Sequence, residues 1–323
     1  MLFELPIVFH SDGTPLIGRL FRNTASLQER QPAIITMGSW LTVKEQMATT
    51  YARRLAESGY TTFVFDFSGF GESRGEPRQA EIPARKIRDI EAAAGLLETL
   101  AFVDPARIGC LAICASAQYA LRALAGGVPI RSFVSVAGWY HDPDSVAPFY
   151  GNGPGVAMRL DRARTALDRY ARTGDVTMVP AYKDGDDRAG MYFPLDYYGR
   201  SDRGAIAAWK NEMAEMTWTY WLTFDGLSAA RSVSTPTMLV HSDDCVFPEH
   251  VRQVHAQLSG PKELVWATGN QIDFYDQPAQ VDTAVHAATG WFDRTLRNHP
   301  RVVPCARKAR PALRDQLPVT ELG

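Results

Sequence analysis

Cysteine is scarce in this chain of 323 residues. Four are present, and no two of them form a Cys-x-x-Cys pair. So few thiols without paired spacing argue against a disulfide framework and against a structural zinc site. Free thiols in a reducing compartment fit the pattern better. The four are Cys110, Cys114, Cys245 and Cys305.

Long apolar runs and an excess of one charge are also missing. The formal net charge is -2, with 46% hydrophobic and 22% charged residues, which gives no reason to expect a nucleic-acid or anionic-membrane partner. No stretch approaches the roughly 18 consecutive apolar residues of a membrane-spanning helix, and the opening MLFELPIVFHSDG does not resemble a signal peptide. We therefore expect a soluble, cytoplasmic protein that acts on a small molecule.

Cofactor motifs are absent as well. GFGES follows an expected strand, but it lacks the Lys-Ser/Thr of a phosphate-binding loop and the spacing of a dinucleotide fingerprint. The histidines, cysteines and carboxylates form no cluster with metal-ligand spacing. We expect no cofactor and no metal, while the sequence leaves the number of subunits, a homodimer included, undetermined.

What the chain does contain is a regular alternation of short apolar runs and helical patterns. Such alternation predicts the α/β class, with a mainly parallel, doubly wound sheet covered by helices on both faces. The segment IVFHSDGTPLIGRLFRN alternates around an Asp-Gly-Thr turn and predicts an antiparallel hairpin at the sheet edge. The expected parallel strands are 32–38, 61–67, 107–114, 131–138, 235–242 and 262–269.

Roughly ninety residues interrupt this alternation. They include the amphipathic helix GVAMRLDRARTALDRYA and an unusual share of aromatic and Met side chains, which suit either a small core of their own or a pocket lining. We interpret residues 141–233 as a helical lid inserted into a core of residues 1–140 and 234–298. Residues 299–323 are Pro-rich and basic without periodicity, and we expect a loosely attached tail.

Cys114 lies where a buried strand runs directly into a helix, in RIGCLAICASAQY. Ala112 and Ser116 occupy the small-residue positions of a nucleophile elbow, which must be small because the turn is tight. The helix dipole favours a thiolate at a helix N-terminus by a few tenths to about 1 kcal/mol. Cys114 is therefore the candidate nucleophile, although a buried structural cysteine, as Cys110 is expected to be, is the alternative.

With these features the chain resembles the α/β-hydrolase superfamily from about Leu5 to Leu296. The cysteine in the elbow looks like the dienelactone-hydrolase branch, and Phe65 to Arg78 looks like the superfamily's loop after its fourth strand. Thr36-Met-Gly-Ser-Trp40 matches the loop that carries an oxyanion-hole amide. The resemblance therefore implies that the backbone N–H groups of Ser39 and Ala115 form the oxyanion hole.

The same resemblance calls for an acid after the strand at 235–242 and a histidine after the strand at 262–269. Asp244 lies at the usual spacing of the acid, with Asp243 as its neighbour and helix capping as the alternative role. The histidine is absent, because Asn270 and Gln271 occupy the loop where it belongs, and an amide cannot take a proton from a thiol near neutral pH.

Two histidines at strand ends are candidates to replace the missing base. His141 follows the strand after the nucleophile's helix, and we expect it to reach across to Cys114, oriented by Asp142 or Asp244. His241 matches a largely structural histidine of the relatives.

Three functions fit these features. The first is hydrolysis or acyl transfer at an ester, thioester or lactone of an apolar or aromatic small molecule. The second is a non-hydrolytic lyase or cyclase of a natural-product pathway, with Gln271 in place of the histidine, and the third is a non-catalytic binding protein. In either enzyme an aromatic pocket would hold the carbonyl substrate. Candidate contacts are Trp40, Trp139, Tyr140, Tyr192, Tyr197, Trp218 and Trp221.

Overall fold

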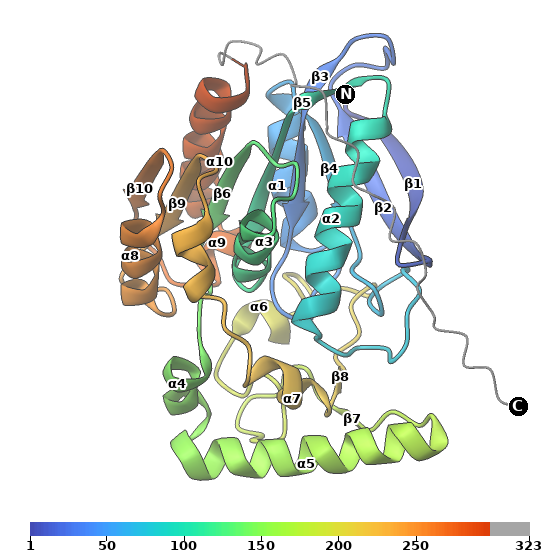
Figure 1. Cartoon of the computed structure of the whole chain (residues 1–323), viewed down its shortest axis with the longest axis vertical. Helices are drawn as coiled ribbons and strands as arrows, with labels where there is room; N and C mark the ends of the chain where they lie inside the picture. Colours follow the sequence, from blue (N-terminus) through green and yellow to red (C-terminus); the bar gives the residue numbers. More distant parts are fainter. Residues whose placement is uncertain (298–323) are drawn as a thin grey trace, which may run out of the picture.

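The computed structural model describes residues 1–297, so the expected tail at 299–323 lies outside the described residues. Within this part of the chain, eight strands form one sheet (Figure 1). Six of them run parallel to one another, and the first two, β1 and β2, form an antiparallel hairpin at one edge. The predicted α/β class is confirmed. In spatial order the strands are β1 (Phe3–Ser11), β2 (Thr14–Arg22), β4 (Thr61–Phe65), β3 (Gln31–Met37), β5 (Val103–Ile113), β6 (Ser132–Val136), β9 (Thr237–His241) and β10 (Lys262–Trp266).

The N-terminal hairpin lies at one edge of the sheet, as predicted. β1 pairs with β2 in antiparallel register, with Ser11 opposite Thr14. The two residues between them, Asp12 and Gly13, both have positive φ, at 47° and 77°. A two-residue turn in which both residues have positive φ matches the right-handed twist of the flanking strands. Asp and Gly tolerate positive φ, which explains why this pair is found there.

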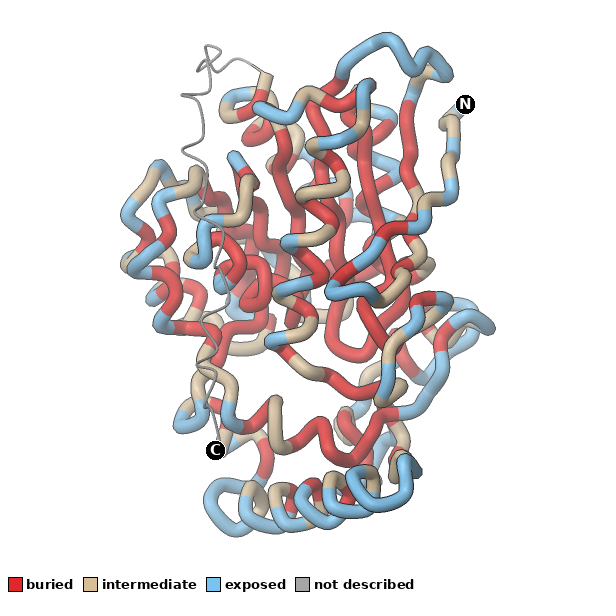
Figure 2. Tube along the Cα trace, turned by 45° about the vertical axis from the view of Figure 1, so that its right-hand side comes forward, coloured by how far each residue is buried: buried red, intermediate tan, exposed pale blue. Residues whose placement is uncertain are grey.

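Helices cover both faces of the sheet. α1 (Met47–Glu57) packs against α10 (Pro278–Phe292) on one face, while α2 (Pro83–Thr99), α3 (Ser116–Ala125) and α8 (Pro248–Gln257) cover the other (Figure 1). The strands between them are buried (Figure 2). Two-sided burial is the reason why β3 to β6 read as nearly continuous apolar runs. No helix within residues 1–297 is long and apolar enough to cross a membrane.

The segment between β6 and β9 lies across one end of the sheet, with α5 outermost (Figure 1). The expected long helix is present, but the segment is not purely helical, because β7 and β8 form a small antiparallel sheet. The outward side of α5 is exposed, whereas Ala163 and Ala166 are buried (Figure 2). Its elements are α4 (Pro143–Val146), η1 (Ala147–Tyr150), α5 (Asn152–Thr173), β7 (Met178–Val179), α6 (Asp196–Gly199), β8 (Met213–Ala214), α7 (Thr217–Trp221) and η2 (Ser228–Ser232).

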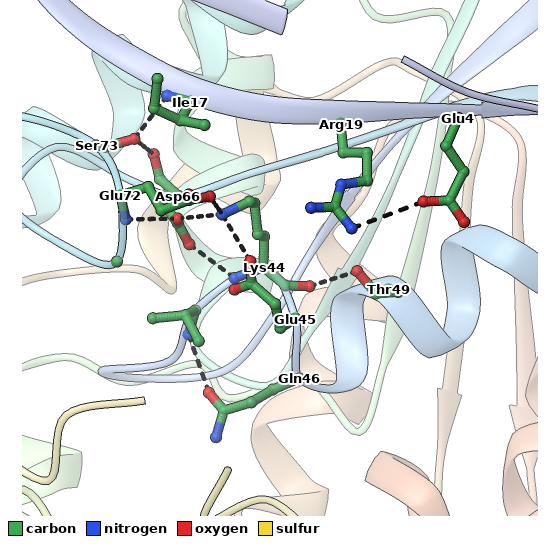
Figure 3. Close-up of polar contacts among 12 residues, drawn as sticks. Glu4, Ile17, Arg19, Lys44, Glu45, Gln46, Thr49, Asp66, Glu72 and Ser73 are labelled. Atoms are coloured by element: carbon green, nitrogen blue, oxygen red, sulfur yellow. Dashed lines mark hydrogen bonds and ion pairs between the residues drawn. The ribbon is translucent and has the colours of Figure 1, made fainter. Parts of the chain in front are cut away.

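A buried ion pair holds the segment after β3 against the end of β4 (Figure 3). Lys44 donates to Asp66 from its ammonium group at 2.7 Å and from its backbone N–H at 2.8 Å. The Lys44 ammonium also contacts Glu45 and Glu72, so the cation among these three carboxylates is a side chain of the protein itself. Gly71 allows the close approach, because a Cβ there would lie 2.2 Å from the Asp66 carboxylate.

Candidate active site

Cys114 occupies a strained turn between β5 and α3. Its φ of 57° lies in the left-handed region, which costs a non-glycine residue about 1–3 kcal/mol. Three backbone hydrogen bonds hold this conformation. The Cys114 N–H donates to the carbonyl oxygen of Val136 at 3.1 Å, and the Cys114 carbonyl oxygen accepts from the N–H groups of Ala117 and Trp139, both at 3.0 Å. Ala112 and Ser116 beside it are buried. The turn therefore has the shape that the sequence predicted for a nucleophile elbow.

Four groups that can donate a hydrogen bond act on the Cys114 sulfur. Burial raises the pKa of this thiol, and donors from Ser39, Tyr275, the backbone N–H of Ala115 and Gln271 lower it in turn. Burial is the largest of these effects, so the thiol is protonated at neutral pH when the site is empty. The same donors would stabilise negative charge on the sulfur or on a carbonyl oxygen bound beside it.

Gln271 lies in the loop between β10 and α9 (Asp273–Asp276), beside the sulfur, and hydrogen bonds fix it there. Its Oε1 accepts from the backbone N–H of Val246 at 3.2 Å. Its Nε2 donates to the carbonyl oxygen of Ala137 at 2.7 Å and to Tyr275 Oη at 3.4 Å. The amide therefore links the loops after β6, β9 and β10, but it offers no basic atom to Cys114.

Tyr275 is the residue at the sulfur that the sequence reasoning missed. It is buried in α9, and its Oη lies 3.1 Å from Ser39 Oγ. A signal was present, because Tyr275 follows Gln271 by four residues, close to the loop that the resemblance places beside the nucleophile. Tyr198, from α6, also lines the site, and its buried Oη has no hydrogen-bond partner.

The sulfur opens into an apolar cavity of about 570 Å³, including space open to solvent at its mouth. Three of the expected aromatic contacts, Trp40, Trp139 and Trp221, line this cavity. Among the described residues that line it there is no histidine, aspartate or glutamate. The lining comprises Ser39, Trp40, Cys114, Trp139, Phe149, Tyr150, Gly190, Met191, Phe193, Leu195, Tyr198, Trp221, Val246, Gln271, Ile272 and Tyr275.

Four other expected contacts lie behind this lining. Trp218 is fully buried against Trp40, with ring centroids 5.9 Å apart, and Tyr197 packs edge-on against Tyr275. Tyr192 donates its hydroxyl to the carbonyl oxygen of Phe149 at 2.7 Å. Tyr140 is fully buried at the end of β6. None of the four lines the cavity, and Trp218, Tyr197 and Tyr192 pack against residues that do.

His141 does not fit the expected role of base. Its Nδ1 accepts from Trp139 Nε1 at 2.7 Å, so its Nε2 carries the proton and donates to the carbonyl oxygen of Trp221 at 2.9 Å. Both ring nitrogens are therefore engaged, and burial lowers the pKa of the ring to about 4. His141 orients two tryptophans of the cavity, while Asp142 caps α4 with its carboxylate.

The candidate acid is also outside the cavity. Asp244 is exposed in the loop after β9, and its neighbour Asp243 pairs with Arg252 at 2.7 Å. Val246, two residues further on, is the residue that brings this loop to the cavity. His241 is buried at the end of β9, and its ring packs on Trp266 with centroids 5.6 Å apart. Neither Asp243 nor Asp244 orients a base in this arrangement.

The loop after β3 is continuous with the cavity wall. Ser39 and Trp40 line the cavity, and the Leu41 carbonyl oxygen accepts a hydrogen bond from Trp209 Nε1 at 2.8 Å. Leu41 itself has a φ of 58°. The inserted segment therefore holds this loop from one side, next to the Ser39 backbone that the sequence assigns to the oxyanion hole.

Comparison with known proteins identifies the family of the chain. A profile of the alpha/beta hydrolase family matches residues 36–284. The chain is 33% identical to polyketide transferase claH of Penicillium crustosum over 80% of this chain and 86% of that protein. It is 30% identical to thiohydrolase aneE of Aspergillus aculeatus, over 78% and 81%.

A similar fold is found among solved structures. The crystal structure of the alpha/beta hydrolase GrgF from Penicillium sp. sh18 superimposes with a TM-score of 0.78 at 20% identity, covering 92% of this chain and 99% of that one. The match of fold, strand order and family profile leads to one conclusion. The chain belongs to the alpha/beta hydrolase family.

Proposed function

We propose that this chain is a hydrolase-like enzyme in which Cys114 takes up an acyl group from a thioester. The setting of the Cys114 sulfur is the observation that carries the proposal. The sulfur lies at a strained turn, beside an apolar cavity, with hydrogen-bond donors around it. Backbone donors in such a position stabilise the oxyanion of a tetrahedral intermediate by roughly 2.7–4 kcal/mol each. Here these donors would be the N–H groups of Ala115 and Ser39.

The lining of the cavity supports an acyl group with apolar or aromatic character. Trp40, Trp139, Phe149 and Trp221 are among the residues that line it. Relatives named as a polyketide transferase and a thiohydrolase favour a thioester over the ester and lactone carbonyls that share the same chemistry. In this proposal the inserted segment, residues 141–233, serves as the lid over the acyl chain.

The acyl group on Cys114 can then be released by water or passed on without hydrolysis. The non-hydrolytic candidate is either transfer to an acceptor other than water or cyclisation. The specific observation in its favour is that no histidine or carboxylate lines the cavity among the described residues. Release by water needs a base to activate the water, whereas a thiol, an amine or an internal nucleophile is more reactive toward a thioester. We therefore place acyl transfer ahead of hydrolysis.

The test uses an N-acetylcysteamine thioester of 3-phenylpropionic acid. Intact-mass measurement should find one acyl group on the wild-type protein and none on Cys114→Ala. Product formation without an added acceptor should stop near one equivalent, and an excess of 2-mercaptoethanol should restore turnover as the exchanged thioester.

Two outcomes would change this assignment. Turnover that survives Cys114→Ala would remove the nucleophile. Steady release of free acid by the wild type without an acceptor would restore hydrolysis to first place.

A further inference from the structure

We propose that the Tyr275 hydroxyl relays the proton of Cys114 to the leaving group, in place of a histidine. This inference rests on the proposed acyl transfer. Its basis is the position of Tyr275 Oη, which lies among Cys114, Ser39 and Gln271 at the inner end of the cavity.

Among the described groups that donate toward the sulfur, Tyr275 is the one suited to this role; Tyr198 lines the same cavity but is not one of these donors. The Gln271 Nε2 donates only, and its Oε1 is occupied by Val246, so Gln271 cannot accept a proton. A hydroxyl can accept one proton while it gives up another, and a phenol is far more acidic than the aliphatic hydroxyl of Ser39. Ser39 Oγ at 3.1 Å and Gln271 Nε2 at 3.4 Å hold the Tyr275 Oη in place.

Tyr275 is protonated in the empty site, so it can pass a proton on but does not serve as a pre-formed phenolate base. Burial, together with the neighbouring Cys114, raises the pKa of Tyr275 well above its usual range. The phenol therefore keeps its proton, as does the Cys114 thiol whose pKa burial also raises. Both partners start neutral, so the transfer needs no charge separation in the apolar cavity before the substrate arrives.

Acyl exchange between thiols balances without any net proton. The Cys114 Sγ–C bond forms as the carbon–sulfur bond of the substrate thioester breaks. The Cys114 proton passes to Tyr275 Oη while the Tyr275 proton passes to the leaving sulfur. When an acceptor thiol takes the acyl group, the protons return by the same route, and the enzyme ends in its starting state.

The experiment compares two thioesters of the same acid, one with an alkyl thiol and one with thiophenol as leaving group. Thiophenolate leaves without a proton, whereas an alkyl thiolate leaves poorly without one. In Tyr275→Phe the rate of Cys114 acylation should fall at least about 10-fold more for the alkyl than for the phenyl thioester, as expected for loss of a general acid. The readout is the ratio of the two rates, which mere structural damage does not change.

Tyr51→Phe is the matched control. The Tyr51 hydroxyl is also buried and donates to the carbonyl oxygen of Phe274, next to Tyr275, at 2.7 Å. Its loss disturbs α9 without removing a donor at the sulfur, so any loss of rate should be equal for both thioesters.

Each result decides a separate question. An unchanged ratio in Tyr275→Phe would overturn the relay while leaving Cys114 as nucleophile. Absence of acylation in the wild type with both thioesters would instead overturn the proposed function, and the relay with it. If Tyr275→Phe does not fold, Ser39→Ala removes the 3.1 Å partner that positions the hydroxyl, and a smaller change of the ratio in the same direction is expected.

Discussion

The carboxylate of Glu81 accepts a hydrogen bond from the backbone N–H of Leu41 at 3.2 Å. The same fully buried carboxylate accepts from Lys86 and from the Tyr119 hydroxyl, both at 2.8 Å. Tyr119 belongs to the helix that follows Cys114. One carboxylate therefore ties the loop after β3 to the helix that follows Cys114.

The first prediction concerns the buried ion pair between Glu81 and Lys86. Glu81→Gln leaves the Lys86 ammonium buried without its counter-charge, and loss of one partner of a buried pair costs about 3–5 kcal/mol of unfolding free energy. Urea denaturation measures the loss. Glu72→Gln is the control, because that carboxylate is exposed and Lys44 keeps Asp66, so it should cost under about 1 kcal/mol. A loss in Glu81→Gln no larger than in the control would contradict the importance of the pair.

Alkylation of Cys114 should depend steeply on pH. Since burial raises the pKa of this thiol, its reaction with iodoacetamide should rise roughly tenfold per pH unit from pH 7 to beyond pH 9. Cys245, whose pKa burial raises to about 11, and the fully buried Cys110 should react after it. Peptide mass mapping at limiting reagent measures the order. A plateau of Cys114 labelling near pH 7 would mean that the empty site already holds a thiolate.

His141 should affect stability at acid pH. Its pKa is about 4 in the folded chain, lowered by burial from an ordinary value near 6.5, so the unfolded state binds the proton more readily. The neutral, buried His141 therefore stabilises the folded chain fully above about pH 6.5, and this stabilisation is lost as the pH falls toward 4. The loss in unfolding free energy is at most about 3 kcal/mol. His141→Gln should flatten the curve of unfolding free energy against pH in this window. His286→Gln, at an exposed site on α10, should leave the curve as it is.

Restoring a histidine in the loop should restore release by water. Gln271→His places an imidazole beside the Cys114 sulfur, and a general base typically contributes 10²–10⁴-fold. We expect the acyl-enzyme to hydrolyse at least about 100-fold faster, measured by the decay of the acylated mass. Asn270→His is the control, because Asn270 is exposed and does not line the cavity. Equal hydrolysis by both variants would show that the position of Gln271 is not what prevents release.

Much of the fold could be predicted from local patterns. The apolar runs mark the strands because those strands are buried on both faces, and Asp12-Gly13 marks the hairpin because its turn needs positive φ. The elbow at Cys114 was readable for a similar reason, since Ala112 and Ser116 must be small. The assignment to a dienelactone-hydrolase-like branch stays a prediction.

The site as a whole could not be predicted, because it depends on tertiary contacts. Nothing local distinguishes His141, whose two nitrogens bond to Trp139 and Trp221, from a histidine that faces the nucleophile. Tyr198 lines the cavity because of the way in which the inserted segment folds, and this segment has no simple periodicity from which its course could be predicted. Of the aromatic contacts expected in that segment, Trp221 lines the cavity, whereas Tyr192, Tyr197 and Trp218 do not, and tertiary packing alone decides between them.

The hydrogen bond from Trp209 to the Leu41 carbonyl oxygen couples the inserted segment to the backbone beside the cavity. A displacement of the segment that broke this bond would leave the corner after β3 still held by Glu81 through the Leu41 N–H, but on one side only. Under the proposed acyl transfer, the Ser39 backbone would then be most firmly positioned when the inserted segment is in place, so binding and positioning would be linked through one indole.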